Sequence, residues 1–336
     1  MWKEIKNICL KLLLLILPFF IVLPLYCRFF PFFYLDEEYA MYQQQYDFVN
    51  AIDKAKKENA ENQEPSVLII GDSRAKAAFD PAYLSDDPNK VYNLALGGTT
   101  PIEGYYTLKN YLGNHEKPEQ VVLSYAPMHM MDVDTLWTRC IYFHTFEKED
   151  FEDLTTTAKQ FQKTEHILID HYDLEYLMYQ LYLPNKYATA LRKSGFIGRY
   201  QTTSQKYDMM VESGGHTFYG TAEYSDGING EAKVSDFEPS DVIVWYIQRI
   251  VNLCNDEGIA LIIEQAPVNE TSYGIITPDF KEHYRVIMNR LAEKNTSAAI
   301  YTDFYCYPNN CFGDADHLNA YGVETFCKQM KEKYRW

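Results

Sequence analysis

A serine that could act as a nucleophile follows the first apolar run of the body of the sequence. The run over residues 66–71 ends in Gly71-Asp72-Ser73, and residues 74–84 have helical character, so Ser73 is expected at a strand-to-helix turn. Open α/β sheets bind ligands at the edge where such turns lie. There the hydroxyl of Ser73 can face a cleft, and its N–H group at a helix N-terminus can stabilise an oxyanion. The alternative is that Ser73 is an ordinary helix N-cap.

A histidine with a carboxylate nearby precedes the last expected helix. The sequence Asp314-Ala315-Asp316-His317 places a carboxylate three residues before His317. A serine nucleophile needs a base that takes its proton and an acid group that orients the base, and a loop aspartate three residues back can reach the imidazole Nδ1. Asp316 is a second candidate for the orienting group. Without a nucleophile elsewhere in the chain, the pattern would describe a helix N-cap beside a surface histidine.

Alternating strands and helices must position these two motifs. The sequence predicts strands over residues 66–71, 91–96, 120–126, 259–266 and 298–304, and helices over residues 74–84, 102–112, 241–257, 279–294 and 318–333. This alternation predicts an α/β domain with a parallel sheet and crossover helices, to which both ends of the body contribute. Residues 132–239, rich in Tyr, His and charged residues, are expected to form an insertion or cap over the carboxyl edge of the sheet.

The motifs and their order resemble the SGNH, or GDSL, hydrolase superfamily. The similarity rests on Gly71-Asp72-Ser73 after the first strand, a glycine-containing turn over residues 93–100 after the second, and the Asp-x-x-His motif before the last helix. It covers about residues 66–130 and 240–334. The resemblance implies a three-layer, flavodoxin-like fold for residues 66–336.

The same resemblance assigns roles to individual residues. It implies that Ser73 is the nucleophile, His317 the base and Asp314 the group that orients the base. It also implies that the N–H group of Gly98 joins that of Ser73 in an oxyanion hole, with Gly97 as the other possible glycine. It implies neither a metal ion nor an organic cofactor.

One block of the family pattern is missing. Where the family has Gly-x-Asn-Asp after the third strand, this chain reads Ser124-Tyr125-Ala126-Pro127-Met128-His129, with no asparagine to complete the oxyanion hole. Loss of one such donor typically lowers the rate about a hundredfold or more. Arg139 and His129 are candidate substitutes, and the alternative is that both are ordinary surface or core residues.

The N-terminal segment has the length and apolarity of a membrane anchor. Residues 12–35 contain a single charge, Arg28, and two dozen residues suffice to cross a bilayer. Basic residues precede the segment (Lys3, Lys6, Lys11) and acidic residues follow it (Asp36, Glu37, Glu38). This bias predicts that residues 1–11 are cytoplasmic and that the body is extracytoplasmic. A cleaved signal peptide is the rival interpretation, but bulky aromatic residues stand where a cleavage site needs small ones.

Three further features limit the possible functions. Residues 36–65 are polar and helix-forming, which predicts a stalk helix without chemistry of its own. The net charge of −16 opposes binding of a phosphate backbone, so nucleic acid is not an expected partner. The 7 cysteines show no CxxC pair and no metal-ligand spacing with histidine. Cys306 and Cys311 are spaced for a local disulfide, and free thiols are the alternative.

The anchor and the missing asparagine together resemble a subset of the superfamily. Its members are extracytoplasmic and work beside membrane-bound O-acyltransferases, in polysaccharide O-acetylation and teichoic-acid D-alanylation. The resemblance implies serine-dependent acyl transfer, of acetyl above all, to or from a hydroxyl of a cell-envelope polysaccharide or acylated glycan. The alternatives are a non-catalytic, polymer-binding scaffold for a membrane acyltransferase, and a simple carbohydrate or lipid esterase.

Overall fold

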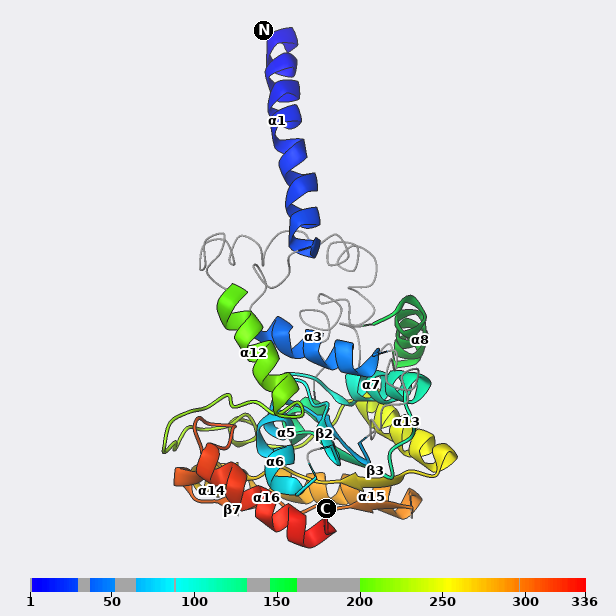
Figure 1. Cartoon of the computed structure of the whole chain (residues 1–336), viewed down its shortest axis with the longest axis vertical. Helices are drawn as coiled ribbons and strands as arrows, with labels where there is room; N and C mark the ends of the chain where they lie inside the picture. The colour runs from blue at the N-terminus through cyan, green and yellow to red at the C-terminus, as the bar shows by residue number, and fades with distance from the viewer. Residues whose placement is uncertain are drawn as a thin grey trace.

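Figure 1 shows a computed structural model of the chain, with an N-terminal helix that stands away from an α/β body. The structure describes residues 2–29, 37–51, 65–87, 89–131, 146–161, 200–295 and 297–336.

A parallel sheet forms the centre of the body. In the described part of the chain it has five strands, in the order β2 (Val91–Asn93), β1 (Val67–Gly71), β3 (Gln120–Ser124), β4 (Ala260–Ile263) and β6 (Ala298–Ile300). The order of connection reverses between β1 and β3, which are paired in register from Val67 with Gln120 to Gly71 with Ser124. Parallel α/β sheets bind ligands at this kind of reversal, beyond the carboxyl ends of the strands.

Helices cover both faces of the sheet, because every second strand residue points to the opposite side. On one face, Leu68, Ile70 and Leu123 join a core with helices α7 (Pro101–Asn114), α13 (Asp241–Glu257) and α15 (Pro278–Lys294). On the other face, Ile69 and Val122 join a core with helices α5 (Ser73–Ala78), α6 (Pro81–Leu84) and α16 (Ala320–Tyr334). The expected α/β class with a parallel sheet is confirmed.

The remaining elements are shorter or lie outside these layers. The helices are α1 (Trp2–Phe29), α3 (Glu37–Val49), α8 (Lys148–Ala158), α12 (Tyr200–Glu212) and α14 (Glu270–Ile275). A small parallel pair is formed by β5 (Val268–Asn269) and β7 (Cys306–Tyr307). The 3-10 helices are η1 (Pro127–Met130), η3 (Lys159–Phe161), η4 (Glu231–Lys233) and η5 (Asn309–Cys311).

Several boundaries differ from the sequence expectation. The helix expected over residues 74–84 is two helices, because Pro81 has no N–H group to continue α5 and Asp80 instead caps α6. β2 ends at Asn93, whose side-chain amide donates to the carbonyl oxygens of Ala75, Lys76 and Phe79. Of the expected insertion over residues 132–239, residues 146–161 and 200–239 are described.

The expected membrane span over residues 12–35 is not found. Among the described residues, no helix is both long and apolar enough to cross a bilayer. Helix α1 begins at Trp2, ten residues before the expected span, and so includes Lys3, Lys6 and Lys11. Residues 30–35 of the expected span lie outside the described part of the chain.

Residues 37–49 do not form the stalk expected over residues 36–65. They form α3, which packs on the body with Ala40, Met41 and Tyr42 almost fully buried and with α12 beside it (Figure 1). Apolar side chains among the polar ones give α3 a face that the body covers, a pattern that composition alone does not reveal. Residues 52–64 lie outside the described part.

Two cysteines near the C-terminus are not paired. The structure holds both Cys306, which is exposed, and Cys311, which is buried, as free thiols. The disulfide hypothesis is therefore not supported, and the alternative of free thiols holds in this structure.

Lys76 on α5 is buried, and within the described part of the chain no carboxylate forms an ion pair with it. Lys76 is fully buried on α5, and its ammonium donates to Gln44 Oε1 at 3.2 Å and to the carbonyl oxygen of Asn93 at 3.5 Å. Burial lowers the pKa of Lys76 from 10.5 to about 7. Lys76 thus connects α5 to α3 and β2. Burial of its ammonium group lowers the stability of the folded chain.

We predict that Lys76→Met stabilises the protein near neutral pH. Between pH 7 and 10.5 the folded chain binds fewer protons at this position than the unfolded chain, so wild-type stability rises with pH in that window. Removing the buried amine should raise the free energy of unfolding at pH 7 by about 1 kcal/mol. A gain of this size raises the melting temperature by about 2 to 4 °C. Thermal unfolding of both proteins at pH 7 and 10 measures this. A gain in melting temperature that is equal at pH 7 and pH 10 would contradict the lowered pKa of Lys76.

Candidate active site

The serine expected at a strand-to-helix turn is at that position. β1 ends at Gly71 and Ser73 is the first residue of α5, so its N–H group has no acceptor within the helix. Gly71 is required because a Cβ there would lie 1.9 Å from the carbonyl oxygen of Ser124 on β3. The N-cap is Asp72 and not Ser73, which leaves the serine hydroxyl available for another contact.

The buried carboxylate of Asp72 fixes this turn. It is fully buried and accepts hydrogen bonds from the N–H groups of Arg74 at 2.9 Å and Ala75 at 3.4 Å. Its second oxygen accepts the N–H of Ala126, beyond the end of β3, at 2.6 Å. The two neighbouring strand ends are thereby joined beside Ser73.

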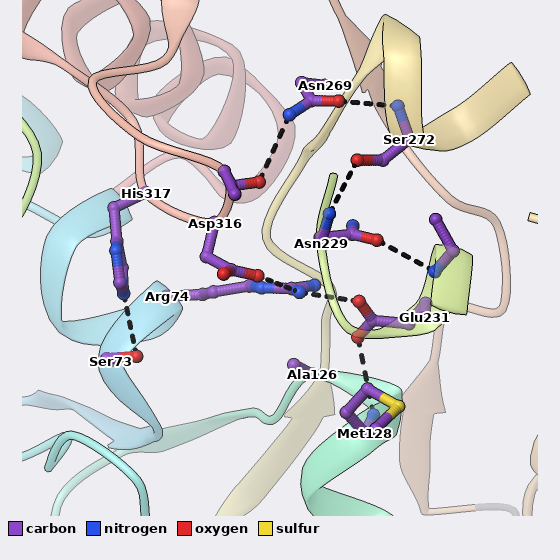
Figure 2. A network of polar contacts seen from close by, with 12 residues as sticks. Ser73, Arg74, Ala126, Met128, Asn229, Glu231, Asn269, Ser272, Asp316 and His317 are labelled. Atoms are coloured by element: carbon purple, nitrogen blue, oxygen red, sulfur yellow. Dashed lines mark hydrogen bonds and ion pairs between the residues drawn. The ribbon is translucent and has the colours of Figure 1, made fainter. Parts of the chain in front are cut away.

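Ser73, His317 and Asp314 lie together in a hydrogen-bonded series. His317 Nε2 is 2.8 Å from Ser73 Oγ, and His317 Nδ1 is 2.8 Å from Asp314 Oδ2 (Ser73 and His317 in Figure 2). Tyr219 stacks on the imidazole with ring centroids 4.6 Å apart. This is the geometry in which an imidazole can take the serine proton while a carboxylate holds its tautomer.

Asp314 is the carboxylate that contacts His317 Nδ1, and Asp316 has a different partner. Asp314 also accepts the N–H groups of Asp316 at 2.8 Å and of His317 at 2.7 Å, so it holds the turn as well as the ring. Burial favours a higher pKa for Asp314, but the hydrogen bonds and charge of His317 and the two N–H groups outweigh it and lower the pKa. Asp316 instead pairs with Arg74.

Arg74 joins three segments beside the nucleophile. Its buried guanidinium lies 2.6 Å from Glu231 Oε2 on η4 and 2.6 Å from Asp316 Oδ1 in the catalytic turn (Figure 2). Burial alone would lower the pKa of Arg74, but the carboxylates of Glu231, Asp316 and Asp72 raise it, so the charge is retained. Ser73 and Arg74 are adjacent, so this pairing fixes the separation of the serine and histidine segments.

A second set of polar groups supports the turn over residues 314–317. Asn269 Nδ2 donates to the carbonyl oxygens of Gly227 at 2.8 Å and Ala315 at 3.1 Å. Its Oδ1 caps α14 by accepting the N–H of Ser272 at 2.7 Å, and Ser272 Oγ accepts the N–H of Asn229 at 3.0 Å (Figure 2). The segment over residues 225–231 is thus fixed against the turn over residues 314–317.

The glycine turn lies against α3. Gly98 has φ +71°, a left-handed conformation that favours glycine, and a Cβ on Gly97 would lie 3.6 Å from Ser73 Cβ. The Gly97 N–H donates to Met41 Sδ at 3.2 Å, and the Tyr219 hydroxyl donates to the same sulfur at 2.8 Å. One buried thioether therefore contacts both the glycine turn and the ring that covers His317. Of the two glycines that the sequence offers for an oxyanion hole, Gly97 directs its N–H to Met41.

The segment after β3, where the family pattern has an asparagine, contacts Asp72 through its backbone. Ala126 directs its N–H to Asp72, and His129 Nε2 lies 4.0 Å from Asp72 Oδ2. His129 is therefore placed toward the buried N-cap carboxylate. Arg139, the other candidate, lies outside the described residues.

Sequence analysis missed four residues of this site. They are Met41, Arg74, Tyr219 and Glu231, and only Arg74, adjacent to Ser73, had a local signal. The other three come from segments interpreted as a stalk or an insertion, and their role depends on contacts across the fold.

Comparisons with known proteins do not assign this chain to a family. No protein-family model matches it, and no curated protein is a match for its sequence. Within the described residues, no group of three or more His, Cys, Asp and Glu side chains could hold a metal ion.

The two carboxylates on Arg74 allow a matched prediction. Glu231 is fully buried whereas the Asp316 side chain is 39% exposed. Glu231→Gln should therefore destabilise the protein by about 3 kcal/mol, since it leaves a buried charge undercompensated, and Asp316→Asn by less than about 1 kcal/mol. Urea unfolding of both variants measures the difference. Equal losses would mean that Glu231 does not compensate the buried charge.

Proposed function

We propose that this protein carries out serine-dependent acyl transfer, with acetyl as the favoured acyl group, to or from a hydroxyl of a cell-envelope polysaccharide. The observation that carries the proposal is the hydrogen-bonded series of Ser73, His317 and Asp314 at the carboxyl edge of a parallel sheet. The similarity of its motifs to the SGNH superfamily supports the same chemistry.

In the first half of the reaction, Ser73 Oγ attacks the acyl carbonyl carbon while its proton passes to His317 Nε2. Asp314 stabilises the imidazolium that forms. The N–H groups of Ser73 and Gly98 are assigned to the oxyanion of the tetrahedral intermediate. The intermediate collapses to an acyl-serine, and the leaving alkoxide takes the proton from His317.

In the second half, an acceptor hydroxyl gives its proton to His317 and attacks the acyl-serine carbonyl carbon. Ser73 leaves as the second tetrahedral intermediate collapses, and the proton on His317 returns to Ser73 Oγ. Water as the acceptor makes the reaction a hydrolysis, and a sugar hydroxyl makes it a transfer. Both outcomes use the same residues of this chain.

The proposed cellular setting follows from the N-terminal segment. Apolar side chains on α1 are widely exposed, Leu13 at 60% and Leu15 at 77%. We propose that α1 contacts a lipid bilayer through these side chains and that the body is extracytoplasmic. A membrane-bound O-acyltransferase is the proposed partner that supplies or receives the acyl group.

Acylation of Ser73 is the direct test. Incubation of the full-length chain with p-nitrophenyl acetate should add one acetyl mass to the wild type and release p-nitrophenol. Ser73→Ala should show neither, and His317→Ala should be slower by about a thousandfold or more, because His317 is the imidazole hydrogen-bonded to Ser73 Oγ and placed to take its proton. Intact mass spectrometry and absorbance measure the two signals. Wild type that behaves like Ser73→Ala would favour the non-catalytic scaffold.

Met41 offers a test of the contact between α3 and the glycine turn. Met41→Leu keeps the apolar volume but removes the sulfur that accepts the Gly97 N–H and the Tyr219 hydroxyl. We expect kcat for p-nitrophenyl acetate to fall by about 3- to 10-fold with KM nearly unchanged, because one hydrogen bond to a buried donor is worth about 1 kcal/mol. Steady-state kinetics separate the two constants. A rise in KM alone would assign Met41 to substrate binding instead.

A further inference from the structure

A cleft that the acyl-transfer steps do not use lies beside the catalytic turn. Its volume is about 440 Å³, and its walls are residues 221–223, Asn310 and Tyr321. Tyr321 stands in the first turn of α16, which begins three residues after His317. The volume is in the range of pockets that bind small molecules.

One buried side chain holds the walls together. Asn319 Nδ2 donates to the carbonyl oxygens of Ala222 at 3.1 Å and Asn310 at 3.0 Å, and its Oδ1 caps α16 by accepting the N–H of Gly322. Asn319 lies two residues after His317, so their Cα atoms are within about 7.6 Å of each other. The cleft is therefore pre-formed and directly attached to the base.

The wall over residues 221–223 is also continuous with the cover of the base. Gly220 packs so tightly that a Cβ there would lie 2.5 Å from the carbonyl carbon of Gly313 and 2.7 Å from the backbone nitrogen of Asp314. The preceding residue, Tyr219, stacks on His317. Both walls of the cleft are thus only a few residues along the chain from groups that contact His317 or its turn. A molecule bound in the cleft would lie beside that turn.

The lining has the chemistry of a neutral sugar site. Tyr321 is 60% exposed and presents a ring whose negative face attracts the C–H groups of a pyranose. Thr221, Asn310 and Glu223 supply a hydroxyl, an amide and a carboxylate, which can bond to sugar hydroxyls. Among the described residues that line the cleft there is no lysine or arginine, and Glu223 adds negative charge, so anionic sugars are disfavoured.

We infer that this cleft binds a neutral pyranose unit of the acyl acceptor, with Tyr321 stacked on the sugar ring. The inference deepens the proposed function, and it rests on that function for the claim that the bound sugar is the acyl acceptor. It identifies Tyr321 and Glu223 as determinants of which glycan is used, separate from Ser73, His317 and Asp314.

The test measures sugar binding in a chain that cannot react. The full-length Ser73→Ala protein is titrated with cellopentaose as the neutral probe and with pentagalacturonate as the anionic probe, by saturation-transfer NMR and calorimetry. Cellopentaose should bind, and adding Tyr321→Ala should weaken its binding by about 5- to 10-fold through loss of the ring contact. Tyr321→Phe should retain binding of cellopentaose, because it keeps the ring. Glu223→Gln should reduce the ratio of the affinity for cellopentaose to that for pentagalacturonate.

Trp245→Ala is the matched control, because Trp245 is 46% exposed on α13, across the sheet from α16. It should leave cellopentaose binding unchanged. The inference is overturned if cellopentaose does not bind, if Tyr321→Ala binds it as well as Ser73→Ala alone, or if pentagalacturonate binds more tightly. Circular dichroism of each variant shows that the loss is not one of folding.

The acylation assay separates the two proposals. Acetylation of Ser73 without binding of cellopentaose would support the proposed function and overturn the sugar site in the cleft. Binding of cellopentaose through Tyr321 without acetylation of Ser73 would support the sugar site and overturn the proposed acyl transfer.

Discussion

The buried charge of Arg74 is the constraint on which the candidate site depends. A guanidinium taken out of water must keep its carboxylate partners, and here they are Glu231 and Asp316, 157 and 242 residues further along the chain. Because Arg74 follows Ser73 and Asp316 precedes His317, the Arg74–Asp316 ion pair holds the segments of Ser73 and His317 next to each other. The geometry of the candidate site thus depends in part on the compensation of one buried charge.

The N-terminal helix of the body is part of the site. Helix α3 buries Met41 and Tyr42 against the glycine turn, where Met41 Sδ accepts the Gly97 N–H and the Tyr42 hydroxyl donates to the Gly97 carbonyl oxygen at 3.3 Å. Lys76 holds Gln44 of the same helix from below. Three separate contacts therefore connect α3 to helix α5 and to the β2–α7 turn.

The region after β3 bears on how fast the site can act. Asp72 accepts the Ala126 N–H at 2.6 Å, so the backbone just beyond β3 helps to fix the serine turn at the position where the family pattern has an asparagine. An oxyanion site with fewer donors is best suited to acyl groups on good leaving groups, since each missing donor raises the barrier. The cleft beside His317 would offset part of this by holding the acceptor close to the acyl-serine.

The sequence by itself determined the local features of this protein. Alternating apolar runs and helical segments gave the parallel α/β sheet, and Gly71-Asp72-Ser73 and Asp314-x-x-His317 identified the turns that meet at its carboxyl edge, because strand ends and helix starts are encoded by neighbouring residues. From the residues alone, two carboxylates could orient His317, Asp314 three residues before it and Asp316 one residue before it, and only the family resemblance favoured Asp314. The tertiary structure separates them, because Asp314 contacts His317 Nδ1 and Asp316 pairs with Arg74. The same holds for α3, Tyr219 and Glu231, whose roles come from long-range packing and buried charge that no local pattern records.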